Sequence, residues 1–335
     1  MFEKMLHEVV TTYGPTSREQ KISDLIRSYV TPWCDEVKND ALGNLIAFKK
    51  GTSGKKVMLS AHMDQIGLIV TDIDENGFLR VSNVGGVSPV IACATHFVFE
   101  NGTRGVTYFE TEKKKLTEIG MTELFMDIGA TTREEAEEKV GIGDIATYLP
   151  NFVIRGNRVS TPYLDNRVCC YILMEALKNA KTNHDLYVVF TVQEEVGLRG
   201  AGPAAYAIEP DFALNLDVCG AGCTPKCARQ SVRLGNGPTI KVMDSSVIVP
   251  APVRKFLEDV AKENGIPYQF EILRGGGTDT GAIQRTRTGI VAGCVSIPTR
   301  YIHTPVETAD LNDIENAIRL AGKVLEQDTL PVMPR

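Results

Sequence analysis

Histidine is scarce in this 335-residue sequence, with five residues in all, so each deserves scrutiny as a possible ligand. His62 and His303 each follow an apolar, strand-like run and precede polar, turn-forming residues. In an open α/β sheet that position is the carboxyl edge, where ligands bind. We expect His7, His96 and His184, which lie in other settings, to take no part in chemistry.

Carboxylates occupy the same kind of position on neighbouring segments. Glu194 and Glu195 end one apolar run, and Asp217 ends another. Asp165 stands at the start of an expected helix, where its simplest role is that of an N-cap. Because many anions at one sheet edge repel one another, two divalent cations would be needed to neutralise them. Mixed histidine and carboxylate ligands suit zinc, cobalt or manganese better than calcium.

The adjacent glutamates are expected to have different roles. Successive side chains on a strand point to opposite faces, so Glu194 and Glu195 are unsuited to binding one metal together. One can bind metal while its neighbour acts as a general base. Asp64, two residues after His62, could accept the spare imidazole N–H and fix its tautomer, or could simply form a surface salt bridge.

The elements that must position these residues can be read from apolar periodicity. A 3.6-residue period predicts helices over residues 2–10 and from Ser17, where Gln20 would complete a capping box. Alternating elements follow, with expected strands at 44–48, 56–60, 186–192, 212–216 and 289–297 and expected helices at 167–177, 252–263 and 314–325. The alternation predicts an α/β fold with a mostly parallel central sheet covered by helices.

The middle of the chain has a different pattern. From about residue 69 to 157, short strand-like runs are broken by turn residues, and one helical patch covers 133–139. We therefore expect residues 67–158 to form an inserted small β-rich domain. Residues 1–66 and 159–335 would together form the catalytic domain.

Composition excludes several classes of protein. The net charge of −6 and the pI near 5.5 argue against nucleic-acid binding, because that affinity rests on clustered Lys and Arg. The one dense basic run, at 113–115, is flanked by glutamates and is expected to be a solvated loop. No apolar stretch approaches the ~18 residues of a membrane span, and the N-terminus lacks the features of a signal peptide, so a cytoplasmic location is expected.

The eight cysteines fit a reducing compartment, since they are scattered through the chain rather than framing a disulfide scaffold. Cys219, Cys223 and Cys227 share a four-residue spacing. They could form a soft metal site, but no partner Cys or His pair lies nearby in sequence. Unrelated free thiols are the simpler interpretation.

The candidate residues lie in six ordered motifs: Ala61-His62-Met63-Asp64, Leu164-Asp165-Asn166-Arg167, Val192-Gln193-Glu194-Glu195-Val196-Gly197, Asn215-Leu216-Asp217, Gly277-Thr278-Asp279 and Arg300-Tyr301-Ile302-His303-Thr304. In this order and spacing the motifs resemble those of the M42 metallo-aminopeptidases, a family that includes glutamyl and leucyl aminopeptidases and aminopeptidases of the tetrahedral type. The resemblance runs nearly end to end.

The resemblance implies a site with two divalent ions per chain, zinc or cobalt by preference. Asp165 would bridge the two ions. His62 and Asp217 would complete one metal site, and Glu195 and His303 would complete the other.

The same resemblance implies the remaining roles. Glu194 would be the general base acting on a water that bridges the metals, with Asp64 supporting the site. The glycine-rich loop at 275–279 would line the cleft; it lacks the Gly-Lys-Ser/Thr ending of a phosphate-binding loop. The expected substrate-binding residues are Gly277, Thr278, Asp279 and Arg300.

The implied activity is removal of N-terminal residues from peptides. The β-rich insert resembles the family's assembly domain, which implies self-association, to a dodecamer built from dimers. Two features depart from the family pattern. Gln65 stands where an acidic residue is usual, and residues 110–121 are unlike the usual insert.

Three other functions remain open at this stage. A metal-dependent amidase or deacylase acting on small N-acyl compounds would use the same ligands. A glycoside hydrolase needs two carboxylates flanking the sugar and gives the histidine pair no task. A scaffold that uses metal only for assembly leaves Glu194 without a role.

Overall fold

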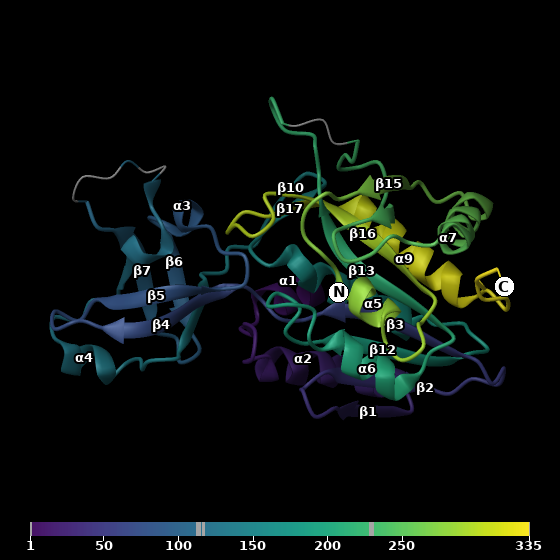
Figure 1. The fold of residues 1–335 in the computed structure, drawn as a ribbon, viewed down its shortest axis with the longest axis horizontal. Helices are drawn as coiled ribbons and strands as arrows, with labels where there is room; N and C mark the ends of the chain where they lie inside the picture. The colour runs from purple at the N-terminus through teal and green to yellow at the C-terminus, as the bar shows by residue number, and fades with distance from the viewer. Residues whose placement is uncertain (1, 112–114, 116–117, 228–230, 335) are drawn as a thin grey trace.

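The computed structural model describes residues 2–111, 115, 118–227 and 231–334. Within them the chain forms a large sheet layered with helices and, beside it, a separate β-barrel (Figure 1). Residues 113 and 114 of the basic run lie outside the described part, as do residues 112, 116 and 117 of the stretch that departs from the family pattern. Among the described residues, no helix combines the length and apolar character needed to cross a bilayer.

The large sheet has 11 strands, in the order β1-β2-β12-β3-β13-β16-β17-β11-β10, with β14 pairing both β16 and β15. The strands are β1 (Glu36–Asn39), β2 (Leu45–Lys49), β3 (Lys56–His62), β10 (Val153–Arg155), β11 (Arg158–Ser160), β12 (Asp185–Thr191), β13 (Phe212–Gly220), β14 (Thr239–Met243), β15 (Gln269–Ile272), β16 (Ala292–Arg300) and β17 (Thr308–Asp310).

The expectation of a mostly parallel sheet holds for the centre and not for the margins. The four central strands β12, β3, β13 and β16 run parallel. On either side, β2 and β17 run antiparallel to their inner neighbours. Short connections explain the margins, because a tight turn such as the one between β10 and β11 can only join antiparallel strands. The sheet is therefore mixed.

Helices cover both faces of the sheet. On one face, α5 packs on β3 and β13, with α1, α2, α7 and α9 around it, and on the other face α6 and α8 pack on β3 and its neighbours. The helices are α1 (Phe2–Thr11), α2 (Gln20–Val30), α5 (Leu164–Lys178), α6 (Ala201–Ile208), α7 (Ala251–Glu263), α8 (Asp279–Gln284) and α9 (Leu311–Leu325).

Alternate side chains of the central strands pack into two separate cores, one on each face of the sheet. Val57, Leu59 and Ala61 of β3 point to the core beneath α5, whereas Met58 points to the core beneath α6 and α8. This two-residue period is the one that a strand imposes, and all four side chains are buried. A strand apolar on both faces is what the three consecutive apolar residues at 57–59, within the strand expected at 56–60, predict.

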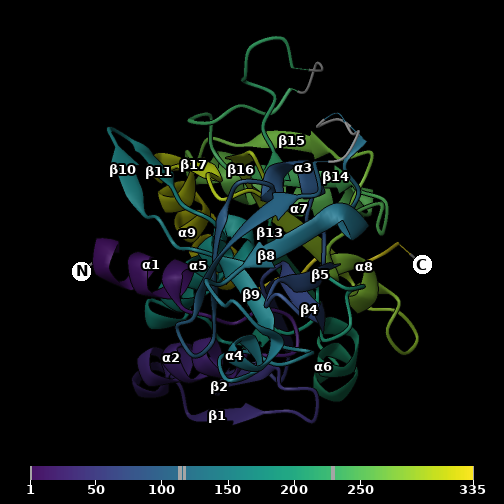
Figure 2. The same ribbon diagram turned by 90° about the vertical axis from the view of Figure 1, so that its left-hand side faces the viewer.

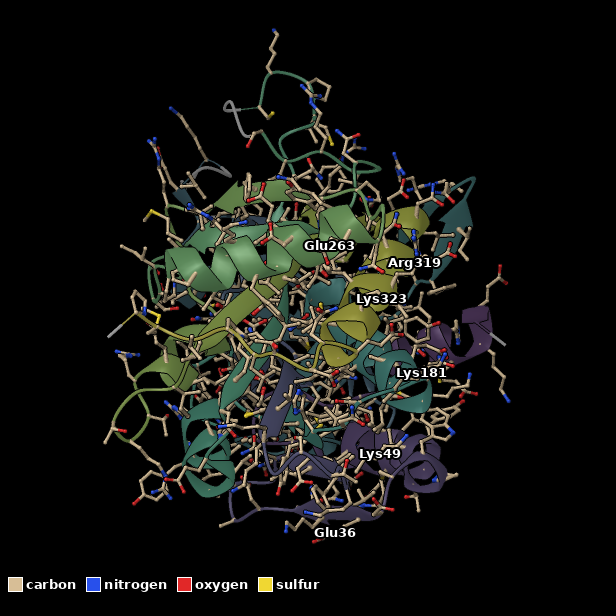
Figure 3. The ribbon with its side chains drawn as sticks, turned by 90° about the vertical axis from the view of Figure 1, so that its right-hand side faces the viewer. Glu36, Lys49, Lys181, Glu263, Arg319 and Lys323 are labelled. Carbon is tan, nitrogen blue, oxygen red and sulfur yellow. The ribbon has the colours of Figure 1, made fainter. Side chains whose placement is uncertain are left out.

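The outer helices show the complementary pattern. On α9, Ile314, Ala317 and Leu320 are buried, while Arg319 and Lys323 lie on the outer side, at the end of the molecule away from the barrel (Figure 3). Glu263 at the end of α7 lies on the same surface. The 3.6-residue spacing of apolar residues thus sets which side faces the sheet.

The second unit is a closed barrel in which every neighbouring pair of strands is antiparallel. Figure 2 views it with the barrel toward the reader. Its elements are β4 (Gly67–Ile73), β5 (Leu79–Val84), α3 (Pro89–Ala92), β6 (His96–Phe99), β7 (Arg104–Phe109), β8 (Leu124–Asp127), α4 (Arg133–Glu137) and β9 (Ile145–Tyr148), with short 3₁₀ turns at Met121–Glu123 and, outside the barrel, at Thr31–Trp33.

Two local expectations differ from the structure. The second helix begins at Gln20, and its first turn has no side-chain cap, because Ser17 adopts a left-handed backbone (φ 69°) instead of an N-cap conformation. At the other junction, β10 lies within the range expected for the insert, yet it pairs with β11 in the large sheet. The domain boundaries at 66/67 and 158/159 remain a prediction.

Candidate active site

The register of the central strands brings predicted site residues to one level. His62 ends β3 and lies opposite Thr191, the last residue of β12. On the other side, Asn215 lies opposite Ser60, which places Asp217 two residues further on, level with His62. Glu194 lies three residues beyond the end of β12. The carboxyl edge of the parallel strands therefore collects these side chains, as the sequence predicts.

Asp165 comes to the same edge from the start of α5, but not as an N-cap. Tyr163 occupies the cap position, and Asp165 has a non-helical backbone (φ −76°, ψ 107°). Its backbone N–H donates to Glu307 Oε2 at 2.8 Å, and the backbone N–H of His303 donates to Glu307 Oε1, also at 2.8 Å. One buried carboxylate thus fixes the backbone of two predicted ligands.

The two oxygens of Asp165 face two different histidines. Oδ1 lies 3.2 Å from Nε2 of His62, and Oδ2 lies 3.4 Å from Nε2 of His303. His303 Nε2 is also 3.2 Å from Glu195 Oε2. Asp165 therefore stands between two clusters, each of which contains a histidine.

Two sets of three residues are close enough to hold a metal ion, with ligand atoms within 4.8 Å of one another: His62 with Glu194 and Asp217, and His62 with Asp165 and Glu195. Both sets come from the predicted residues. The distances also place Glu194 Oε2 3.8 Å from His62 Nε2, so Glu194 lies at the edge of the ligand cluster as well as facing the cavity.

The charge state of this cluster follows from burial and crowding. Burial raises the pKa of Glu194 and Asp217 well above their ordinary values, and repulsion between carboxylates adds to it. Burial opposes the charge on His303, but its hydrogen bonds to carboxylates raise its pKa to about 12. Burial likewise raises the pKa of Asp165, yet the two histidines outweigh it and hold that pKa below its usual value. The cluster favours positive charge, as protons on histidine or as divalent cations.

The donor set fits divalent metal. Asp217 Oδ1 accepts the backbone N–H of Val218 at 2.8 Å, but its Oδ2 is buried without a hydrogen-bond partner in the described part of the chain. Among the same residues, the ion pairs of these carboxylates are with histidines alone. Imidazole nitrogens and carboxylate oxygens with a free lone pair are ligands that zinc and cobalt accept.

Asp64 is fully buried beneath the cluster, and its contacts go beyond the expected one. Oδ1 lies 3.4 Å from Nδ1 of His62, a contact not aligned as a hydrogen bond. Its two oxygens accept the backbone N–H groups of Glu194 at 3.0 Å and Glu195 at 3.3 Å, and the hydroxyl of Thr16 at 2.7 Å. Asp64 therefore orients the turn that carries both glutamates.

The barrel unit contributes the turn after β5 to the site. A Cβ on Gly86 would lie 2.4 Å from Nδ1 of His303, and a Cβ on Gly85 would lie 3.1 Å from Cβ of Glu195. Only glycine allows the backbone to approach these two side chains so closely. In the sequence this Gly-Gly pair is one of the turn signals that break the strand-like runs between residues 69 and 157, and nothing there places it at the site.

A cavity of about 590 Å³ opens beside the cluster and is lined by His62, Asp165, Glu194, Glu195, Asp217 and His303, together with Gly277 and Thr278 of the glycine-rich loop. Asp279 and Arg300 are not among the residues that line it. Asp279 is buried behind the loop, where Oδ2 accepts the Thr191 hydroxyl at 2.5 Å. Burial raises its pKa to about 6.

Arg300 points to a different loop. Its guanidinium donates to the Cys223 carbonyl at 2.8 Å and to the Cys223 sulfur at 3.0 and 3.2 Å. All eight cysteines are free, and none belongs to a candidate metal group in the described residues.

Gln65 accepts the Gly14 N–H at 3.0 Å, which ties the segment after α1 to the site loop.

Comparison with known proteins agrees with this architecture. A model of the M42 glutamyl aminopeptidase family matches residues 43–320. A protein of Acetivibrio thermocellus is 47% identical over 321 residues, covering 96% of this chain and 97% of that protein. The lysyl aminopeptidase of Pyrococcus furiosus is 40% identical over 338 residues, covering 97% of this chain and 96% of its own.

Solved structures share the whole fold. Aminopeptidase APDkam598 from the archaeon Desulfurococcus kamchatkensis superposes with a TM-score of 0.94 at 36% identity, covering 98% of this chain and 95% of its own. PhTET1-12s, whose structure contains a dodecamer, has a TM-score of 0.88 at 34% identity, covering 98% and 99%. Sheet, barrel and histidine–carboxylate cluster together are those of a peptidase hydrolase. Within that class, the chain belongs to the M42 family of aminopeptidases.

Proposed function

We propose that this aminopeptidase uses two divalent metal ions, zinc or cobalt, with Asp165 shared between them. His62 and Asp217 would complete one site, and Glu195 and His303 the other. The observation that carries the proposal is that the two oxygens of Asp165 face the Nε2 atoms of two histidines at 3.2 and 3.4 Å. When bound, such ions polarise the substrate carbonyl and make a water molecule more acidic.

Glu194 is the proposed general base. It lines the cavity, its pKa is raised by burial, and its backbone is fixed by Asp64. A carboxylate of raised pKa can take a proton from the attacking water and then pass it to the leaving amine. Glu195, which contacts His303 at 3.2 Å, is the proposed ligand of the pair. Because Glu194 is also close to His62 and Asp217, metal content must distinguish the two roles.

The charge of the site supports attack at the N-terminus of a peptide. Every charged or imidazole side chain that lines the cavity, within the described residues, is a carboxylate or histidine of the cluster. A substrate α-ammonium finds carboxylates to pair with there, or binds metal as a free amine. A substrate carboxylate meets no lysine or arginine among those lining side chains. Exopeptidase action from the N-terminus follows.

Metal removal tests the proposal directly. A chelator should abolish hydrolysis of aminoacyl-p-nitroanilides, and zinc or cobalt should restore it. His303→Ala should bind fewer ions than the wild type when metal is measured by mass spectrometry. His96→Ala changes an exposed histidine of the barrel and serves as the control, with two ions retained. Full activity of metal-free protein would contradict the proposal.

We further propose a dodecamer built from dimers, with residues 67–158, which contain the barrel, as the assembly domain and residues 1–66 and 159–335 as the catalytic domain. The proposal is supported by PhTET1-12s, which is dodecameric and 34% identical over nearly the whole chain. Static light scattering tests it, and a monomer at micromolar concentration would exclude it.

The free state of all eight cysteines supports a cytoplasmic location.

A further inference from the structure

The wall of the active-site cavity beyond the histidine–carboxylate cluster carries no charge. Its apolar side chains are Leu198, Val218, Cys219, Leu273 and Ile302, and glycines make up much of the remainder. They come from four segments of the chain, so the apolar character is not an accident of one loop. We refer to these five residues and the three hydroxyl residues beside them, Ser245, Ser246 and Thr278, as the neutral wall.

The hydroxyls of the neutral wall are already engaged within the protein. Ser246 Oγ donates to Asp244 Oδ1 at 2.7 Å, and Thr278 Oγ1 donates to Asp244 Oδ2 at 2.9 Å. The hydroxyl of Ser245 donates to the Gly276 carbonyl. A hydroxyl committed in this way has no proton to donate to a substrate side chain, because that proton already has an acceptor. The wall therefore presents aliphatic carbon and satisfied polar groups.

Two cations near this wall, Lys241 and Arg300, are committed as well, whereas the exposed Arg199 and Arg274 are not among the residues that line the cavity. Lys241 is fully buried, forms an ion pair with Glu271, and lies 3.4 Å from Asp244 Oδ2. Arg300, next to the segment of Ile302, donates its guanidinium protons to Cys223. Two carboxylates hold the first cation and one loop holds the second, so neither is free to meet an acidic substrate side chain.

From this we propose that the neutral wall receives the side chain of the N-terminal residue and selects an uncharged aliphatic one, such as leucine or methionine. The inference rests on the proposed function of the same site. A glutamate side chain placed against the wall would lose water without gaining a cation from the residues that line it, and a lysine would gain no carboxylate outside the histidine–carboxylate cluster. An unpaired buried charge is costly, whereas each buried methylene favours binding.

A panel of p-nitroanilides tests the selection with the metal-loaded enzyme. We expect kcat/KM for the leucyl and methionyl substrates to exceed that for the lysyl and glutamyl substrates at least about tenfold. A lysyl or glutamyl substrate that matched or surpassed leucyl would overturn the inference and leave the aminopeptidase proposal intact. Hydrolysis of none of the panel would instead count against the proposed function. The lysyl substrate is the most informative member of the panel, because the lysyl aminopeptidase of Pyrococcus furiosus is 40% identical to this chain.

A substitution at Leu198 tests whether the neutral wall itself selects the substrate side chain. Leu198 is half-buried in the cavity lining, and its Cδ1 would be 3.8 Å from a Cβ on Gly277. Leu198→Glu adds a carboxylate there and should raise the lysyl-to-leucyl ratio of kcat/KM at least about tenfold. Val332→Glu adds the same charge at a C-terminal position that is 74% exposed, and should leave the ratio unchanged. An unchanged ratio in a folded, active Leu198→Glu protein would show that the side chain binds elsewhere.

Discussion

Gly86→Ala is the substitution that most sharply tests how the barrel shapes the site. The new Cβ would lie 2.4 Å from Nδ1 and 2.7 Å from Cε1 of His303, and ordinary contacts begin at 3.4 Å. The imidazole or the turn must therefore shift by about 1 Å. The ring's Nε2 contacts with Asp165 and Glu195, at 3.4 and 3.2 Å, would then be lost or distorted. A displacement of that size costs about 10²-fold in rate.

The assay is kcat/KM on leucyl-p-nitroanilide together with metal content and thermal stability. We expect activity to fall about a hundredfold, with one metal site weakened and the fold retained. Gly322→Ala, on α9, is the matched control because its Cβ would meet nothing within 4 Å, and it should be fully active. If Gly86→Ala kept normal turnover and both ions, the close approach of the barrel turn to His303 would have no functional consequence.

Further predictions concern the base, the substrate end and the effect of pH. Glu194→Gln should retain both ions and lose about 10²–10⁴-fold in kcat, whereas Glu195→Gln should lose metal; the reverse pattern would exchange their roles. N-acetylation of a peptide should slow its hydrolysis at least about tenfold, as followed by mass spectrometry. Equal cleavage of the acetylated and the free peptide would contradict N-terminal recognition. Burial and the charge of Asp64 raise the pKa of Glu19 from 4.5 to about 7. The folded state therefore binds this proton more tightly than the unfolded state. The stability that the bound proton contributes is complete below pH 4.5 and is lost as the pH rises through 7. In denaturant titrations with chelator, the free energy of unfolding of Glu19→Gln relative to the wild type should rise by up to about 3 kcal/mol between pH 4.5 and 8. Unfolding free energies that changed in parallel with pH in the two proteins would refute this.

The positions of the proposed ligands could be predicted from the sequence because they follow from strand ends. His62 and Asp217 follow apolar runs that must be buried parallel strands, and parallel strands present their carboxyl ends together. The paired glutamates after β12 obey the same rule. Asp165 was located correctly at the start of a helix, but its backbone conformation depends on Glu307, which is distant in sequence.

What the sequence did not reveal is contact between separate segments of the chain. Glu307 gives no periodic signal, and its role depends on β17 lying beside the segments of Asp165 and His303. Its position four residues after a predicted ligand was the one available hint. Gly85 and Gly86 were indistinguishable from any turn until the barrel was placed against His303. Arg300 was expected to face substrate, yet a loop carrying Cys223 accepts its protons.

Anomalous X-ray diffraction from crystals grown with zinc would show whether two metal ions share Asp165. We expect two peaks about 3.5–4 Å apart, one on each side of the Asp165 carboxylate. One peak should lie against His62 and Asp217, and the other against Glu195 and His303. A single peak, or two peaks that leave Asp165 without a metal contact, would contradict this arrangement.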